Sequence, residues 1–280
     1  MLDIRCAASM RSRRLARGLA VLLVALATTT AWAAGPRLTG LPGPQGAGAH
    51  TPGGRGGKIV RVTSVAAEGP GSFAEAVTGK GPRIVVFEVG GVIDLGMKEL
   101  RITEPFLTIA GQTAPHPGVT IIRGGLTIAA HDVVIRHIPI RPGDGGKPKR
   151  SGRIDAITTG RGAHGLVGAP LTRPPSGGAA HDVIVDHCSL TWATDENLSA
   201  SSTRFHGENE AEWMANASRR ITYSNNIVSE GLAHSTHPKG EHSKGSLIHD
   251  HVNEVLIVGN LYAHNYERSP LFKGGARGQV

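Results

Sequence analysis

The sequence predicts an all-β fold, a right-handed, single-stranded parallel β-helix, and three observations support this prediction. Short runs of β-branched and other apolar residues, bounded by Gly and Pro, recur along most of the chain. Amphipathic helical patterns are nearly absent between them. Four of the runs share one pattern, a polar pair followed by alternating apolar positions, at 131–138, 181–188, 219–226 and 253–260. A strand that recurs with long, uneven connections is typical of stacked coils.

The four similar segments predict which side chains stack on one another. Their first inward positions are Val133, Val183, Ile221 and Val255. Two residues further on, and therefore on the same face of each strand, lie Ile135, Val185, Tyr223 and Ile257. Spacings of 50, 38 and 34 residues are too uneven for a strict repeat, but a β-helix tolerates insertions at its turns. The same alignment stacks Ile138, Cys188, Asn226 and Asn260, and its two Asn residues fit either a side-chain amide ladder or ordinary turn positions.

The elements follow in order from the N-terminus. Residues 1–33 contain several Arg, an apolar run too short to span a bilayer and an Ala-x-Ala pattern, which together predict a cleaved signal peptide. Residues 34–57 are dense in Gly and Pro, which excludes a helix and predicts an irregular leading segment on the surface. A β-helix domain is expected over 58–280, beginning with strands at 58–63 and 83–89 and a capped helical turn at 71–77.

Two other all-β architectures, the sandwich and the propeller, also contain many short strands. Their strands are joined mainly by antiparallel turns, and tight turns of that kind favour Asn-Gly or Asp-Gly pairs. No regular pairs of this type connect the four segments, so parallel coils are favoured. An α/β fold is disfavoured because amphipathic helices are nearly absent.

Charge and cysteine content narrow the functional classes. Removal of residues 1–33 leaves 25 Lys and Arg against 21 Asp and Glu, a net charge of about +4. That excess suits an anionic substrate, but it lies well below that of a dedicated nucleic-acid-binding protein, and no basic run with interleaved aromatic residues is present. Only Cys188 remains after Cys6 leaves with the signal peptide, so an internal disulfide is excluded and stability must come from packing.

Several short motifs, in chain order, resemble those of the pectate lyase superfamily. They are a Gly-rich run at 53–58, Gly-Pro-Gly-Ser-Phe at 69–73, Pro-Arg-Ile-Val-Val-Phe at 82–87, Ile-Ala-Gly-Gln-Thr-Ala-Pro at 109–115, Val-Asp-His-Cys-Ser at 185–189 and Arg-Ser-Pro at 268–270. Each motif is weak alone, but their common order argues against chance agreement. The resemblance implies a parallel β-helix that cleaves α-1,4-linked polygalacturonate by β-elimination.

The implied reaction needs a cation as well as a base. The C5 proton of a uronate is poorly acidic, and a hard dication that neutralises the uronate carboxylate helps the developing charge to delocalise. The resemblance implies Ca²⁺ as cofactor and places two of its ligands at Asp155 and Asp195, with Glu196 as a third candidate. Two carboxylate positions of the family are occupied by Arg153 and Ser199, so weaker calcium binding is expected.

The resemblance also places cationic side chains at the site. Arg268, in the Arg-Ser-Pro motif, falls at the position of the family's base, although a free guanidinium is normally a permanent cation. Lys244 matches a lysine of the family that contacts the substrate, and it completes the predicted catalytic pair. Lys273 lies where a second arginine is common. His237 and Lys239 are further candidates for contacts with the substrate.

The histidine-rich stretch 234–251 and the Asp-His pair at 186–187 are interpreted as structural. The stretch lacks the helical His-Glu-x-x-His arrangement and the Cys partners of a zinc site, so it is expected to be a turn region that flanks the cleft. Asp186 and His187 are expected to form a local hydrogen bond beside the coil. Cys188 is expected to pack as a small apolar residue.

Three other functions stay open from the sequence. A polygalacturonase-like hydrolase would need paired carboxylates, and Asp155, Asp186 and Asp195 do not form the Asp-Asp pair of that family. A calcium-independent pectin lyase is favoured by Arg153 and Ser199 and disfavoured by Asp155 and Asp195. The third is a non-catalytic β-helical protein, either an adhesin or a carbohydrate-binding protein.

The end of the chain and its destination complete the expectations. The sequence stops at Val280, ten residues after Pro270, whereas family members continue for several coils, so an incomplete β-helix of reduced stability is expected. We expect a secreted monomer that acts on an anionic plant polysaccharide, polygalacturonate. No nucleic-acid partner is expected, and no membrane association after removal of the signal.

Overall fold

The computed structural model describes residues 46–160, 179–203 and 205–280. The predicted signal peptide, 1–33, and the first part of the leading segment, 34–45, lie outside the described residues. In the described ranges, no helix has the length and apolar character needed to cross a membrane.

The chain alternates short strands with turns, and helical segments are few and short. The helical segments are η1 (Ala47–His50), α1 (Phe73–Thr78), η2 (Gly111–Thr113) and α2 (Glu210–Ala215). The strands are β1 (Lys58–Val62), β2 (Arg83–Phe87), β3 (Gly91–Ile102), β4 (Leu107–Ala110), β5 (Val119–Ile128), β6 (Val133–Arg136), β7 (Pro139–Arg141), β8 (Ile157–Thr159), β9 (His181–Asp186), β10 (Ser189–Thr191), β11 (Leu198–Ala200), β12 (Arg219–Ser224), β13 (Ile227–Ser229), β14 (Leu247–Ile248), β15 (Asn253–Val258), β16 (Leu261–Ala263), β17 (Leu271–Phe272) and β18 (Gly278–Gln279).

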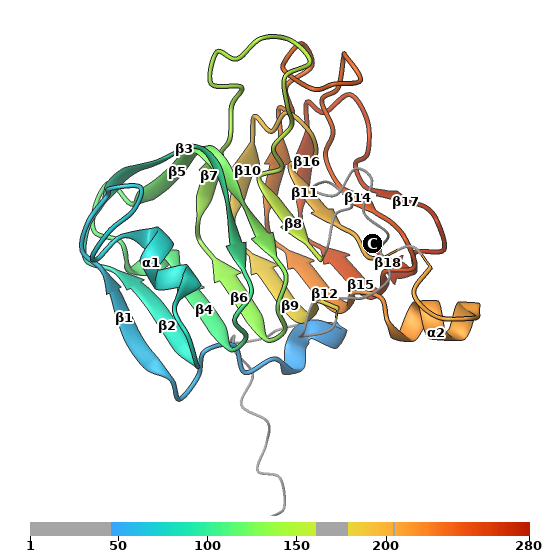
Figure 1. The fold of residues 1–280 in the computed structure, drawn as a ribbon, viewed down its shortest axis with the longest axis horizontal. Coiled ribbons are helices and arrows are strands. Elements are labelled where there is room, and N and C mark those ends of the chain that lie inside the picture. The colour runs from blue at the N-terminus through green and yellow to red at the C-terminus, as the bar shows by residue number, and fades with distance from the viewer. Residues whose placement is uncertain (1–45, 161–178, 204) are drawn as a thin grey trace, which may run out of the picture. The chain divides into compact units, whose positions relative to one another are not determined.

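Eight parallel strands form the first sheet, in the order β1-β2-β4-β6-β9-β12-β15-β18 (Figure 1). The register within this sheet matches the stack predicted from the four similar segments. Val183 pairs with Val133 on one side and with Ile221 on the other, and Ile221 pairs with Val255. These four side chains are at most 3% exposed, so they lie in the interior of the coils. The predicted inward positions are therefore confirmed.

The second sheet forks at the long strand β5. The N-terminal half of β5 pairs with β7, and its C-terminal half pairs with β8. Each later coil then gives one strand to the first sheet and two strands to the two arms of the fork, as β6, β7 and β8 do. A coil with three parallel faces, repeated in register, is a parallel β-helix, and the predicted right-handed fold is confirmed.

Sharp corners bound the strands of the first sheet, and they explain the polar residues of the repeated pattern. The residues at these corners have φ between 51° and 55°, the left-handed region in which Asp, Asn and His are the favoured non-Gly residues. They are Asp132, Asp182, Arg220 and Glu254 near the start of the strands, and His137, His187 and Asn225 after their ends. The polar positions of the pattern are therefore required by the turns of the coil.

A ladder of asparagines occupies one corner next to the first sheet. The Oδ1 atom of Asn226 accepts a hydrogen bond from the Cys188 backbone N–H at 2.8 Å. In the next coil, the Oδ1 atom of Asn260 accepts from both the backbone N–H and the side-chain amide of Asn226, at 2.8 and 2.9 Å. Of the two interpretations that the sequence allowed, the structure shows the ladder.

The expected structural roles of the Asp-His pair and its neighbour are also seen. Asp186 Oδ2 lies 2.7 Å from His187 Nδ1 and also accepts from Arg136 Nε at 3.0 Å, and the His187 ring stacks on that of His137 at 4.9 Å. Cys188 is 2% exposed and belongs to the apolar core, where burial raises the pKa of its thiol to about 12. An unreactive, packed thiol is the consequence.

The described part of the leading segment lies on the outer face of the first sheet. A Cβ atom on Gly48 would come within 2.9 Å of the Val183 carbonyl oxygen, so glycine is needed for this close approach. The segment covers Val134 and Ile184, which point away from the coil interior and are nevertheless buried. The prediction that Gly and Pro exclude a helix is wrong at one point, because Ala47–His50 form a 3-10 helix.

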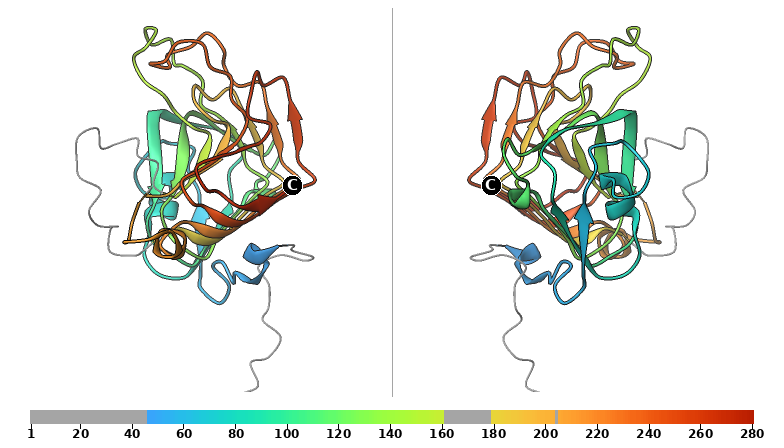
Figure 2. Two further views of the ribbon diagram at one scale, coloured as in Figure 1. Left: turned by 90° about the vertical axis from the view of Figure 1, so that its right-hand side faces the viewer. Right: turned by 90° about the vertical axis from the view of Figure 1, so that its left-hand side faces the viewer.

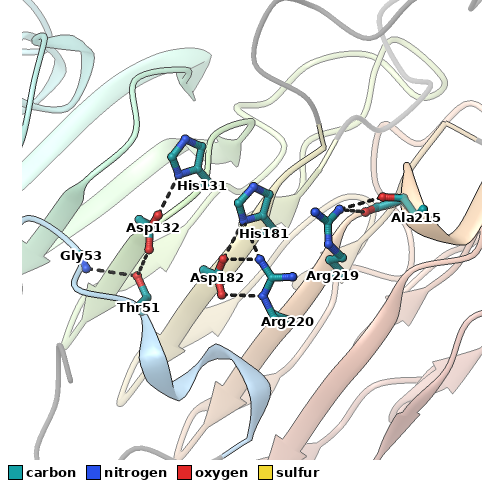
Figure 3. A network of polar contacts seen from close by, with 10 residues as sticks. Thr51, Gly53, His131, Asp132, His181, Asp182, Ala215, Arg219 and Arg220 are labelled. Carbon is teal, nitrogen blue, oxygen red and sulfur yellow. Dashed lines mark hydrogen bonds and ion pairs between the residues drawn. The ribbon is translucent and has the colours of Figure 1, made fainter. Parts of the chain in front are cut away.

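A polar network fastens this segment to the coils (Figure 3). Thr51 Oγ1 donates to Asp132 Oδ1 at 2.9 Å, and Asp132 in turn pairs with His131. One coil further, His181 pairs with Asp182, and the Arg220 guanidinium donates to both Asp182 oxygens, at 2.8 and 2.6 Å. We call the residues His131, Asp132, His181, Asp182 and Arg220 the outer network. Its charges are paired with one another, as expected of a structural cluster.

The predicted helical turn at 71–77 is confirmed by α1. Ser72 caps this helix by accepting from the Glu75 backbone N–H at 3.2 Å, and the Glu75 carboxylate accepts from the Gly71 N–H at 2.7 Å. The buried face of α1 contributes Phe73, which stacks on Phe87 with 5.8 Å between ring centroids. The helix thus packs on the core of the first coils.

Candidate active site

One turn recurs in four successive coils, between the two strands that each coil gives to the forked sheet. These four segments, 142–156, 192–197, 230–246 and 264–270, are called the site turns. The two longest, 142–156 and 230–246, rise together above the sheets in green and orange (Figures 1 and 2). Their contact is direct, because the Gly152 N–H donates to the Thr236 carbonyl at 3.2 Å.

The site turns carry the residues that the resemblance singled out. Asp155 lies in the first, Asp195 and Glu196 in the second, Lys244 in the third and Arg268 in the fourth. Backbone pairing stacks the turns, since Lys244 bridges Glu196 on one side and Glu267 on the other. The Ala156 N–H donates to the Glu196 carbonyl at 3.2 Å and extends this pairing to the first turn. Residues far apart in sequence are therefore neighbours for the same reason that the strands are.

Three carboxylates meet in this stack. Asp155, Asp195 and Glu196 each offer an oxygen within 4.8 Å of the others, and their residues are 9%, 5% and 3% exposed. We call them the carboxylate cluster. Burial, followed by the charge of Asp195, raises the pKa of Asp155 well above its ordinary value. Like charges held together out of water indicate a place for a cation.

The two departures from the family pattern have defined roles around Asp155. Ser199 replaces a carboxylate and donates from its hydroxyl to Asp155 Oδ2 at 2.8 Å, while the Glu196 N–H donates to Oδ1 at 3.2 Å. Arg153 points its Nε toward Asp195 Oδ2 at 3.8 Å. Each departure thus replaces negative charge by a donor or a cation, which weakens the attraction for a metal ion.

The predicted catalytic cations are held by glutamates. Arg268 Nη1 forms an ion pair with Glu196 Oε1, and Lys244 Nζ lies 3.0 Å from Glu267 Oε2. The Arg268 side chain is 14% exposed, and its Nε atom is buried without a hydrogen-bond partner. Burial lowers the pKa of Arg268, although the charges of Asp195 and Asp155 oppose this shift.

The structure does not bring every predicted residue to this place. Lys273 follows β17, and its N–H pairs with the Ile248 carbonyl, so it lies at the corner beyond the site turns. Lys239 lies in the third site turn and is exposed. His237 is in the same turn but only 1% exposed, so it does not offer the surface for the predicted contact with a polymer. Its ring stacks on that of His242, with 3.6 Å between centroids.

Sequence reasoning missed two side chains. His242 Nε2 lies 2.8 Å from Asp195 Oδ1, and Glu267 holds Lys244. The sequence predicts for His242 only a turn region that flanks the cleft, because the histidine-rich stretch lacks the helical pattern and the Cys partners of a zinc site. A usable signal was the position of two histidines, five residues apart, in an insertion that interrupts the coil directly before Lys244.

The carboxylate cluster fits a hard divalent cation such as Ca²⁺. All of its donor atoms are oxygens, which this ion prefers. Burial and the charge of Asp195 raise the pKa of Asp155, so the charged form of this carboxylate is disfavoured, and a bound cation would offset that cost. The residues present are therefore compatible with the cofactor that the resemblance implied.

Fold and site together define the class of protein: a parallel β-helix that gathers carboxylates and cations from successive coils. No protein-family model matches the sequence. A protein named "Probable pectate lyase C" from Emericella nidulans is 34% identical over 238 residues, which are 85% of this chain and 45% of that protein. Proteins of the same name from Aspergillus terreus and Neosartorya fischeri are 35% and 33% identical, over 85% and 91% of this chain. These matches confirm the resemblance to pectate lyases.

The chain spans just under half the length of the curated relatives it matches, since it covers 45% to 49% of these three. Among solved structures, the major allergen Jun a 1 from cedar pollen aligns with 84% of this chain and 67% of its own, with a TM-score of 0.49 and 19% identity.

Proposed function

We propose that this chain is a polysaccharide lyase of the pectate lyase type, which cleaves polygalacturonate by calcium-assisted β-elimination. One observation carries the proposal: the carboxylate cluster, within 4.8 Å, lies beside Arg268 in the stacked site turns. The names of the relatives point the same way. A site that combines acidic ligands with a cation suits a substrate that is itself an acid.

Asp155, Asp195 and Glu196 would hold the calcium ion. When bound, Ca²⁺ supplies the positive charge that neutralises a uronate carboxylate, so that charge developing at C5 can delocalise into it. The coil provides the rigidity for this, because the three residues belong to two turns that are tied together by backbone hydrogen bonds. A preformed cluster needs little reorganisation when its ligand arrives.

Arg268 is the group that we place at the C5 proton. Its partial burial disfavours the charged form, which is the direction a base requires. The ion pair with Glu196 acts in the opposite direction and favours the cationic form of Arg268. Lys244 stands one coil earlier and can orient the uronate carboxylate by charge once a substrate competes with Glu267. Orientation and proton removal are thus assigned to two neighbouring coils.

A specific observation keeps one second candidate, the calcium-independent pectin lyase. Arg153 Nε lies 3.8 Å from Asp195 Oδ2, so a second guanidinium besides that of Arg268 already neutralises part of the charge of the carboxylate cluster. A methyl-esterified substrate carries less negative charge and needs less neutralisation. The two candidates differ in whether a dissociable ion is required.

Lyase activity is measured directly by the absorbance of the unsaturated uronide product. We expect a signal with polygalacturonate and calcium that disappears when a chelator is added and returns with excess calcium. A signal that survives the chelator and grows with methylated pectin would support the second candidate instead. If a chain shown to be folded gives no absorbance signal with either substrate, both candidate functions are wrong.

We also propose export of the protein and action outside the cell on an anionic plant polysaccharide. The support is the pattern of residues 1–33, which lie outside the described residues, and the chemistry of the site. Secretion is checked by fractionation of cells and medium, with detection of the mature N-terminus by mass spectrometry.

A further inference from the structure

Two buried histidines from the third site turn face the carboxylate cluster. His237 and His242 are 1% and 3% exposed, and their rings are nearly parallel, with 13° between planes. The Leu232 N–H donates to the Ala193 carbonyl at 2.9 Å and ties the start of this turn to the second site turn, and the His242 N–H donates to the Ala233 carbonyl at 2.9 Å and closes the turn on itself. The pair therefore has a fixed position above the second site turn.

Both rings direct their Nε2 atoms to the same carboxylate oxygen. His242 Nε2 lies 2.8 Å from Asp195 Oδ1, and His237 Nε2 lies 3.5 Å from it. An ionised carboxylate only accepts hydrogen bonds, so the His242 nitrogen must carry the proton and donate it. His237 Nε2 is buried and has no hydrogen bond of good geometry, although it is aimed at this oxygen.

The second nitrogen of His237 decides where its proton lies. The backbone N–H of Lys239 donates to His237 Nδ1 at 3.1 Å, so Nδ1 is an acceptor and carries no proton. In a neutral imidazole the proton is then on Nε2, toward Asp195. Two N–H groups therefore converge on one oxygen of Asp195.

A transition-metal site is the other way to explain the group Asp195, His237 and His242, whose candidate ligand atoms all lie within 4.8 Å. Metal ligation requires a bare Nε2 lone pair on each ring. The Lys239 N–H on Nδ1 leaves no place for the displaced proton of His237. The geometry favours donors over ligands.

We propose that His237 and His242 are positioning residues that hold Asp195 by its Oδ1 atom and keep its Oδ2 atom turned toward the cation. This inference rests on the proposed function, since it assigns Asp195 to a cation site. Asp195 Oδ2 is the oxygen on the side of Arg153, at 3.8 Å from its Nε. Hydrogen bonds that orient a ligating carboxylate commonly change metal affinity by about 10- to 100-fold when they are removed.

Calorimetric titration of the full chain with calcium tests the assignment. His242→Leu, which removes the donor at similar volume, is expected to raise the dissociation constant at least about tenfold. His242→Gln places an amide N–H near the position of Nε2 and is expected to stay within about threefold of the wild type. His234→Leu is the matched control, because this histidine lies in the same turn with its side chain 76% exposed, and no change is expected.

A second measurement, on the wild-type protein, tests the inference even if His242→Leu does not fold. NMR of the ion-free protein with ¹⁵N-labelled histidine reports which ring nitrogen carries the proton, and Nε2 is expected for both residues. A proton on His237 Nδ1, visible absorption bands of Co²⁺ bound to nitrogen, or calcium binding by His242→Leu equal to the wild type would overturn the assignment. If the wild type binds no calcium, the calcium part of the proposed function fails, whereas the NMR result still decides where the histidine protons point.

Discussion

Two of the stacked histidine pairs that contact aspartates, one in the outer network and one in the site turns, differ in how completely their hydrogen bonds are satisfied. In the outer network, His131 and His181 stack at 4.9 Å, and each bonds the aspartate that follows it in sequence (Figure 3). In the site turns, His237 and His242 stack at 3.6 Å and share one aspartate from another coil. The first pair repeats with the coil, whereas the second belongs to a single insertion.

The difference teaches how to separate structural from functional polar clusters in a solenoid. Among the described residues, no buried side-chain nitrogen or oxygen of the outer network lacks a hydrogen-bond partner, but His237 Nε2 and Arg268 Nε in the site do. An unpaired buried polar group costs about 1–3 kcal/mol. Buried polar atoms without a partner also occur outside the site turns, at Thr127, Thr191, Ser201, His206, His249 and His251, so they do not by themselves mark a functional region. His237 Nε2 and Arg268 Nε are distinguished by belonging to side chains that contact the carboxylate cluster.

The largest expected effect concerns the arginine of each region. Arg268→Ala is expected to lower kcat with polygalacturonate by about 10²- to 10⁴-fold, because it removes the group placed at the C5 proton. Because Glu196 loses its buried ion-pair partner, the melting temperature should fall as well, and kcat is therefore compared per folded molecule. Arg220→Ala is expected to lower the melting temperature and to leave kcat unchanged, since Arg220 neutralises Asp182 in the outer network and touches no site residue among the described contacts.

Steady-state kinetics and thermal melting of the two variants provide the check. Arg277→Ala is the control for loss of a surface arginine, because Arg277 is 62% exposed and pairs only with exposed Glu210 among the described contacts. If Arg220→Ala lost activity per folded molecule as severely as Arg268→Ala, the separation of the two regions would be wrong.

The next effect concerns calcium. Asp195→Asn is expected to weaken calcium binding by about 100-fold, or about 2.7 kcal/mol, because it removes one of three negative ligands. Asp182→Asn removes the same charge from the outer network and should leave the affinity unchanged. Calorimetric titration of both variants measures this, and equal losses would point to a general effect of charge instead of a site.

A smaller effect is expected at the asparagine ladder. Asn226→Ala should lower the free energy of unfolding by about 2 kcal/mol, because it removes the side-chain acceptor of the Cys188 N–H and the side-chain donor to the Val185 carbonyl. Gln112→Ala, at an exposed position of η2, should cause no measurable change. Urea unfolding of both variants tests the claim, and an unaltered midpoint for Asn226→Ala would show that the ladder is dispensable.

The smallest effect depends on pH. Burial alone would raise the pKa of Asp182, but hydrogen bonds from Arg220 and His181 bring it below the ordinary value. A lowered folded-state pKa gives stability that is present above the unfolded value of about 3.9 and is lost as the pH falls toward the folded value. Asp182→Asn should therefore be less stable by about 1–2 kcal/mol at pH 7. The difference in the free energy of unfolding between Asp182→Asn and the wild type should narrow below about pH 4. A difference that widened in acid would contradict the assignment.

The sequence was sufficient for the repeating part of the molecule. The alignment of Val133, Val183, Ile221 and Val255 predicts the observed register, because a strand has a fixed period of two and a coil cannot slip without exposing its core. Only the family resemblance predicted that Asp155, Asp195 and Arg268 lie close together. The structure places them in equivalent turns of stacked coils.

The parts that escaped prediction depend on contacts between segments without a shared period. The leading segment was interpreted from its Gly and Pro alone, whereas its glycines are needed for close packing on the sheet at Gly48. His242 reaches Asp195 from an insertion whose path the strand pattern does not encode. Lys273 was grouped with the site because the family resemblance places a second arginine at this position, but the strand β17 separates its corner from that of Arg268.

The site turns differ in length, whereas the strands beneath them keep a constant register. This difference affects which parts of such a protein can change in evolution. Segment 192–197 is short and 230–246 is long, yet β10, β13 and their neighbours keep one register below both. Loop insertions cost little free energy as they lengthen. Each site turn can therefore change in length and sequence independently, and specificity for a substrate can change one coil at a time while the stacked strands keep their register.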